Sequence, residues 1–158
     1  MRAFRAAEDG YSRRMEWQQG DYLVTDENER VDLPAVCGLL SGTYWASQRA
    51  PEAIVRSVRH SFCFSLFHQG KQVGLMRVIT DFTTMGYLCD VVIAEEHRAR
   101  GLGKWMLEII LQHPSLKGCR LDLFTADAQE FYRSFGFGPH RFTSMVRYPA
   151  EDTGGSGP

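Results

Sequence analysis

Hydrophobic and polar positions along this chain alternate between the period of a helix and the period of a strand. Helical spacing of apolar residues predicts helices from Asp32 to about Leu40, from Pro51 to Val58, from Gly101 to His113, and in a segment ending at Phe135. Strand patterns predict strands at 21–25, 62–67, 72–79, 87–94, 119–125 and 142–147. Interleaved helices and strands of this kind indicate an α/β protein.

Two connections predict how the strands pair. A Gly70-Lys71 turn between two β-rich runs favours an antiparallel hairpin. The helix that begins at Gly101 joins the strands at 87–94 and 119–125, and such a β-α-β crossover makes its two strands parallel neighbours. The expected fold is therefore a central mixed sheet flanked by about four helices.

Length and composition predict a single domain. The chain has 158 residues, of which 44% are hydrophobic and 12% aromatic, enough for one packed core and too few for two typical ones. We place the domain at residues 15–148. Residues 1–14, rich in Arg and Ala, are expected to be a flexible leader, with Met15 as an alternative start, and residues 149–158 a disordered tail.

Charge and cysteine usage exclude several classes of protein. The formal charge of −1, from 18 basic and 19 acidic residues, favours neither nucleic acid nor an anionic membrane as a partner, and no apolar run approaches the length of a membrane span. The four cysteines are widely spaced, which suits reduced thiols and a cytoplasmic setting. No Cys or His spacing typical of a zinc site occurs, so no metal is expected.

The strongest chemical pattern is the run 93–104, where a strand turns into a helix. Gly101 and Gly103 allow a tight turn and close approach of the backbone to a ligand, and the start of the helix directs N–H groups at an anion. Arg98, Arg100 and Lys104 add positive charge, so the run predicts a pyrophosphate site. It is not a dinucleotide fingerprint or a P-loop, because both require glycines that are missing here.

The motif Arg98-x-x-Gly101-x-Gly103 resembles the acetyl-CoA signature of the GCN5-related N-acetyltransferase (GNAT) superfamily. The segment 127–137, which ends in Tyr132, Gly136 and an aromatic residue, resembles the late helix of the same superfamily. Tyr44-Trp45-Ala46 and the run 87–91 are similar to a group of small bacterial members whose acceptors are generally unassigned.

The resemblance implies acetyl-CoA as cosubstrate and direct attack of an amine on its thioester. It implies that a free backbone N–H on the first parallel strand polarises the thioester carbonyl, with Ile93 as the position carried over. The donor site then comprises Val91, Ile93, Arg98, Ala99, Arg100, Gly101, Leu102, Gly103 and Lys104. Tyr132 matches the general acid of the superfamily, although its ring is equally suited to packing against the sheet.

The base and the acceptor site are less defined. Asp90, a charge inside an apolar strand, is a candidate base, and the alternative is that it pairs with a basic residue such as Arg77. Water-relayed deprotonation would need no side chain. The resemblance suggests Tyr44, Trp45 and Arg49 at the acceptor, and Asp81 on the opposite wall, although the aromatic pair could equally cover the sheet.

Three functions fit this sequence. The first is N-acetylation of a small-molecule primary amine, the second is the same chemistry on a protein or peptide amine, and the third is a catalytically silent acyl-CoA-binding module. A homodimer is an expectation taken from the superfamily. The alternation of Phe142 and Met145 is compatible with one.

Overall fold

The computed structural model describes residues 14–148 of the chain. The chain separates into two compact units, Met1–Phe124 and Thr125–Pro158, and each is treated by itself. The expected tail and all but the last residue of the expected leader lie outside the described residues. The expectation of a single domain over 15–148 stays a prediction.

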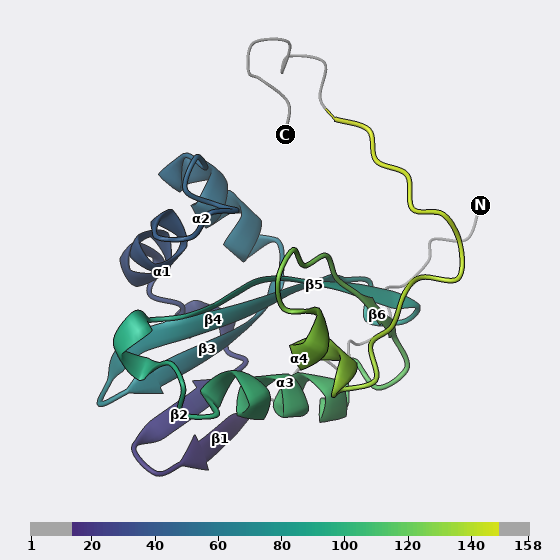
Figure 1. The fold of residues 1–158 in the computed structure, drawn as a ribbon. Coiled ribbons are helices and arrows are strands. Elements are labelled where there is room, and N and C mark those ends of the chain that lie inside the picture. The colour runs from purple at the N-terminus through teal and green to yellow at the C-terminus, as the bar shows by residue number, and fades with distance from the viewer. Residues whose placement is uncertain (1–13, 149–158) are drawn as a thin grey trace, which may run out of the picture. The chain divides into compact units, whose positions relative to one another are not determined.

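The first unit contains a six-stranded sheet, with its strands in sequence order (Figure 1). Its strands are β1 (Glu16–Gln19), β2 (Tyr22–Thr25), β3 (Phe62–His68), β4 (Lys71–Thr80), β5 (Met85–Ile93) and β6 (Arg120–Asp122). Neighbours from β1 to β5 are antiparallel, and β5 and β6 are parallel. The predicted mixed sheet with one β-α-β crossover is therefore confirmed.

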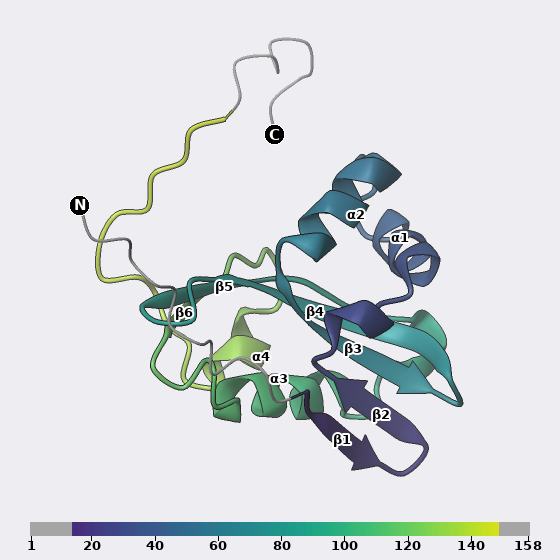
Figure 2. The same ribbon diagram turned by 180° about the vertical axis from the view of Figure 1, so that it is seen from behind.

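Helices cover both faces of this sheet. Helices α1 (Leu33–Ser41) and α2 (Pro51–Arg59) lie on one face, and α3 (Leu102–Gln112), the crossover helix, lies on the other (Figures 1 and 2). Two short 3₁₀ helices, η1 (Asn28–Arg30) and η2 (Glu95–His97), precede α1 and α3. Because β3 and β4 are covered on both faces, their residues are buried almost without alternation.

Local sequence signals account for the ends of these elements. Asp32 caps α1 by accepting a hydrogen bond from the Ala35 N–H at 3.1 Å, and Gly42 ends the helix. Gln69 and Gly70 both have positive φ, +48° and +78°, in the two-residue turn that joins β3 to β4. The antiparallel pairing of β3 with β4 confirms the predicted hairpin, although the turn lies one residue before the expected Gly70-Lys71.

A buried polar pair anchors α3 beneath the sheet. His113, directly after the helix, is 3% exposed, and its Nε2 lies 3.0 Å from Asp26 Oδ2 beyond the end of β2. Its Nδ1 accepts the Ser115 N–H at 3.2 Å, so Nε2 is the nitrogen that donates to Asp26. The contact ties the carboxyl-terminal end of α3 to the segment that follows β2.

The second unit contains α4 (Gln129–Arg133), which is the core of the predicted helix ending at Phe135. The expected strand at 142–147 is wrong, because these residues form no strand. Phe142, Met145 and Val146 are all more than two-thirds exposed, so the alternating apolar residues do not pack against a core.

Two further differences concern short strands. The polar strand β1 was not predicted, because at the edge of a sheet it carries no apolar stripe. Strand β6 pairs with β5 over only three residues, whereas the sequence predicts a strand from Cys119 to Thr125. Because β6 ends early, one edge of β5 has no pairing strand among residues 14–148 beyond Tyr87, whereas the other edge stays paired with β4.

Candidate acetyl-donor and acceptor site

In the described part of the chain, the carboxyl-terminal half of β5 has one edge without a partner strand. Pairing with β6 stops at Tyr87, and no other strand among the described residues pairs with that edge from Leu88 to Ile93. The Ala94 N–H donates to Val73 O on β4 at 2.8 Å. Because successive residues of a strand point their N–H groups to opposite edges, those of Val91 and Ile93 face the unpaired edge.

A β-bulge at Asp90 interrupts the other edge of the same strand. The register between β4 and β5 shifts between Leu75 and Arg77, so that two residues of β5 oppose one of β4. Asp90 has φ +49°, a left-handed conformation that Asp tolerates better than most residues. A bulge turns and twists its strand, and this one lies where β5 parts from β6.

Beyond β5, the chain forms a loop that ends at the start of α3. Ala99 (φ +59°) and Gly101 (φ +75°) are both left-handed, so both residues turn the loop. The first intrahelical bond of α3 runs from the Trp105 N–H to Gly101 O. The N–H groups of Leu102, Gly103 and Lys104 have no acceptor among the described residues, and they point out of the positive end of the helix.

The two arginines of this loop are held by backbone carbonyls. Arg98 Nε donates to Ile93 O at 2.9 Å, and Arg100 Nη2 donates to Glu96 O at 3.1 Å. Both side chains are otherwise exposed, so the rest of each guanidinium is available to an anion. Lys104 Nζ lies 4.0 Å from Glu108 Oε1 on the exposed side of α3.

Gly103 and Gly101 have different roles in the loop. Gly103 lies within the first turn of α3 and does not turn the loop, contrary to the expectation that both glycines do so. A Cβ at Gly103 would meet only Ile93 Cδ1, at an ordinary 3.7 Å. No packing among residues 14–148 requires this glycine, and its open surface beside free N–H groups fits the close approach of a phosphate.

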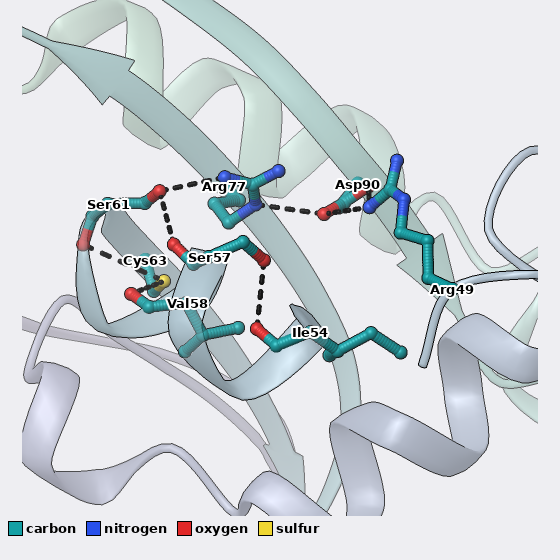
Figure 3. A network of polar contacts seen from close by, with 8 residues as sticks. All are labelled: Arg49, Ile54, Ser57, Val58, Ser61, Cys63, Arg77 and Asp90. Carbon is teal, nitrogen blue, oxygen red and sulfur yellow. Dashed lines mark hydrogen bonds and ion pairs between the residues drawn. The ribbon is translucent and has the colours of Figure 1, made fainter. Parts of the chain in front are cut away.

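On the face covered by α1 and α2, Asp90 joins two arginines (Figure 3). Arg77 Nε donates to Asp90 Oδ2 at 2.8 Å, and Arg49 Nη1 lies 2.8 and 2.9 Å from the two carboxylate oxygens. Arg77 Nη1 also donates to Ser61 Oγ at 2.8 Å. The pairing of Asp90 with Arg77 is the alternative to a catalytic base, and the structure confirms that pairing. Arg49 is a second partner.

The residues predicted for the acceptor lie in different places. Tyr44 and Trp45 stack edge to face, 4.9 Å between ring centroids, in the exposed loop between α1 and α2, and Arg49 ends that loop. Asp81 instead closes its own turn between β4 and β5, where its carboxylate accepts bonds from Thr83, Thr84 and Met85. The bond from the Thr84 hydroxyl, followed by those from the backbone N–H groups, lowers the pKa of Asp81 below its ordinary range.

Thiols near Asp90 are not activated. Burial raises the pKa of Cys63 to about 12 and that of Cys89 to about 11, although Arg77 opposes both shifts. Both groups are therefore protonated thiols at neutral pH. A thiol in that state is a poor nucleophile.

Tyr132 lies in α4 of the second unit. Its ring contacts those of Phe131 and Phe137, with centroids 5.0 and 5.8 Å away. Burial, and then the charge of Asp127, raises the pKa of its hydroxyl, so the hydroxyl keeps its proton at neutral pH. Gly136, with φ +85°, turns the chain after the helix.

No role was predicted from the sequence for three residues near these sites, Tyr87, His97 and Tyr22. Burial raises the pKa of Tyr87 on β5. The charge of Asp90 adds to this shift, and the charge of Arg49 opposes it. His97, in η2, is half-buried, and its Nδ1 lies 2.8 Å from the Tyr22 hydroxyl. For Tyr87, the one signal in the sequence was its position on a predicted strand, two residues before Cys89. The contact between Tyr22 and His97 joins segments 75 residues apart, so no local pattern predicts it.

Two features are absent from residues 14–148. No helix there has both the length and the apolar character needed to cross a membrane. No group of three or more His, Cys, Asp or Glu side chains in that range is arranged to hold a metal ion.

Comparison with known proteins places these features in one family. Residues 59–139 match the family described as the acetyltransferase (GNAT) domain. FG08082 of Gibberella zeae, a candidate acetyltransferase, is 33% identical over an alignment of 140 residues, and the match covers 73% of this chain and 78% of the relative. A second similar protein is xcc2953 from Xanthomonas campestris, a candidate acetyltransferase of the GNAT family. Its crystal structure matches with a TM-score of 0.77 and 37% sequence identity, and the match covers 81% of this chain and 93% of the xcc2953 chain.

A more distant likeness concerns the fold alone. N-acetylglutamate synthase from Neisseria gonorrhoeae, solved with coenzyme A and N-acetyl-glutamate, has a TM-score of 0.60 at 15% identity. The match covers 75% of this chain and 28% of that enzyme.

Proposed function

Because this chain belongs to the GNAT family and is an acetyl-CoA-dependent acyltransferase, we propose that it acetylates a primary amine of a small molecule by direct attack. The observation that carries the proposal is the unpaired edge of β5, which leads into the free N–H groups of α3. An edge of backbone donors next to an anion site suits an extended ligand with a phosphate at one end.

On the donor side, the residues bind and orient. The N–H groups of Leu102, Gly103 and Lys104, with the free donors of Arg98 and Arg100, would hold the pyrophosphate of acetyl-CoA. Acetyl-CoA supplies an acetyl group activated as a thioester. The N–H groups on the open edge of β5, at Val91 and Ile93, are positioned to stabilise negative charge on a carbonyl oxygen, and such donors contribute roughly 2.7–4 kcal/mol in other enzymes.

Direct attack is favoured over a covalent acyl-cysteine route. Cys89 adjoins Asp90 on β5, and a pKa raised to about 11 leaves its thiol about 10⁻⁴ ionised at pH 7. Cys63, with a pKa raised to about 12, is ionised still less. Neither thiol offers the thiolate that acyl transfer to the enzyme requires.

The acceptor amine must lose a proton before it attacks. Asp90 remains a predicted base, but each of its oxygens already accepts a hydrogen bond from a guanidinium, and accepting a proton would disrupt that pairing. The two ion pairs therefore favour a water relay and a structural role for Asp90. Tyr132, whose raised pKa keeps its hydroxyl protonated, is the proposed acid for the departing thiolate.

The small size of the acceptor is inferred from the loop between α1 and α2. Arg49 ties that loop to the bulge of β5, and the buried Ala46 anchors its centre. Tyr44 and Trp45 remain exposed beside it as contact surface. A loop fixed over the strand favours a compact acceptor. Asp81 stays a weaker candidate, because its carboxylate is engaged in its own turn.

Two finer features complete the proposal. All four cysteines are free, which supports a cytoplasmic setting. The exposed apolar residues after α4, Phe142, Met145, Val146 and Tyr148, support a homodimer.

The test is release of free CoA thiol with a panel of primary amines. Thiol release that depends on an amine and saturates with it supports the proposal; its absence across small and peptide amines contradicts catalysis. Tyr132→Phe should lower turnover by about 10² or more, the scale of a lost general acid, without changing acetyl-CoA affinity. Tyr148→Phe, which removes an exposed hydroxyl in the same unit, is the matched control and should leave turnover unchanged.

A further inference from the structure

We propose that the acceptor carries an anionic group, a carboxylate or a phosphate, which binds the unused donors of Arg49. This inference rests on the proposed function and specifies its substrate class. It follows from the way the ion-pair network around Asp90 distributes hydrogen bonds and charge.

Arg49 uses only one of its nitrogens within the protein. Its Nη1 contacts both oxygens of Asp90, whereas Nε and Nη2 have no partner among the described residues. In Figure 3 the other terminal nitrogen points away from Asp90. The Arg49 side chain is 36% exposed, against 1% for Asp90 and 7% for Arg77. The protein therefore fixes one edge of this guanidinium and presents the other.

The charges of the network leave an excess of one positive charge. Two arginines share a single carboxylate, and Arg77 donates its other hydrogen bond to the neutral Ser61. An excess of positive charge in a partly buried site attracts an anion, and a planar guanidinium edge matches the two oxygens of a carboxylate or phosphate.

The same site is poorly equipped for a second cation. Both oxygens of Asp90 are engaged by arginines, and the carboxylate of Asp81 is engaged by its own turn. A polyamine would find neither of these carboxylates free. Tyr44 and Trp45 offer aromatic faces, but cation–π attraction would have to overcome the repulsion from Arg49.

The position of Arg49 also limits the length of the acceptor. Arg49 contacts Asp90, which directly precedes Val91 and lies three residues before Ile93, roughly 10 Å along a strand. The amine would react near the donors of this open edge while the anion rests on Arg49. Amine-to-anion separations up to that value are found in amino acids, from α-amino acids at the short end to ω-amino acids at the long end, and in aminoalkyl phosphates.

The experiment compares acceptors that differ only in the anionic group. One series pairs amino acids with their carboxamides, a second pairs aminoalkyl phosphates with the corresponding amino alcohols, and diamines form a third. We expect the anionic member to have a kcat/KM about 10- to 100-fold higher, the scale of a charge-assisted hydrogen-bond pair. The series with the larger ratio identifies carboxylate or phosphate as the group recognised.

In Arg49→Gln, KM for the anionic member should rise, so that the ratio of kcat/KM between the two members falls to about one. Asp90 retains Arg77 as a partner in this variant, and unchanged acetyl-CoA affinity will report an intact donor site. Arg56→Gln, which removes an exposed guanidinium from α2, is the matched control and should keep the ratio. Neutral or cationic acceptors that perform as well as anionic ones, or a ratio that survives Arg49→Gln, would overturn the inference.

A binding measurement tests the same inference without turnover. N-acetylated amino acids and aminoalkyl phosphates, with their uncharged counterparts, are titrated calorimetrically into the protein saturated with CoA. Tighter binding of the anionic forms that is lost in Arg49→Gln supports the inference; equal binding, or no binding of any anionic form, overturns it. Failure of the wild type to bind acetyl-CoA at all is a separate result, and it would contradict the proposed function itself.

Discussion

The donor loop at 93–104 and the ion-pair network around Asp90 both concentrate positive charge, but they are built in opposite ways. In the donor loop, Arg98 and Arg100 are exposed and bond to carbonyls five and four residues away. In the network, Asp90 is 1% exposed and its partners are 41 and 13 residues distant. One site depends on local backbone geometry and the other on tertiary pairing.

This difference determines what happens when each site is altered. Substitutions in the donor loop should change ligand binding with small effects on folding, because few of its side chains are buried. Substitutions in the network should change folding strongly, since breaking a buried ion pair leaves an uncompensated charge.

The largest expected effect is that of Asp90→Ala. It leaves the buried Arg77 without its charged partner and places Ala at φ +49°, so we expect a loss of about 3–5 kcal/mol in the free energy of unfolding. Urea denaturation measures it. Asp122→Ala removes an exposed ion pair with Arg120 and should lose no more than about 1 kcal/mol. Equal losses in the two variants would show that the network does not act as a buried anchor.

A second prediction concerns the pH dependence of thiol reactivity beside the network. With a pKa of about 11 against an ordinary value of 9.0, Cys89 should be alkylated about a hundredfold more slowly than a free thiol at pH 7. A raised pKa means that thiolate appears only in alkaline solution, so the rate should keep rising with pH beyond 9. Mass spectrometry of the labelled native protein measures it. A rate that levels off near pH 9 would contradict the burial of this thiol.

The third prediction tests the paired half of β5 against its open half. A Cβ at Gly86 would lie 2.7 Å from Leu121 Cδ2 on β6 and 3.0 Å from Val78 Cγ1. Gly86→Ala should therefore destabilise the fold by about 1–3 kcal/mol, measured by urea denaturation. Gly38→Ala, in a helix where nothing lies within 4 Å, is the control and should be slightly stabilising. A neutral Gly86→Ala would mean that β5 and β6 pack less closely than the structure has them.

The smallest expected effect separates the two glycines of the donor loop. Gly101→Ala, at φ +75°, should destabilise the protein by about 1 kcal/mol, whereas Gly103→Ala, inside α3 with room for a Cβ, should stabilise it by a similar amount. Thermal unfolding of the two variants without ligand measures the difference. The same sign for both would show that Gly103 is needed for folding as well.

The contrast between the sites also explains what the sequence could predict. The donor loop was predictable because its glycines, arginines and helix start are contiguous, and so were the elements with strong apolar periods, such as the hairpin at 62–79. The bulge and the second partner of Asp90 were not, since Arg49 and Asp90 meet only through the fold. The strand expected at 142–147 failed because alternation alone does not supply a neighbouring strand.

The most direct test of the donor site is a calorimetric titration with acetyl-CoA of the wild type and of Gly103→Leu. The side chain of Leu would occupy the space beside the free N–H groups while the helix that carries it is kept. We expect saturable binding to the wild type, and affinity at least tenfold weaker in Gly103→Leu without loss of thermal stability. Equal affinity in both proteins, or no binding to either, would contradict the assignment of residues 93–104 as the acetyl-CoA site.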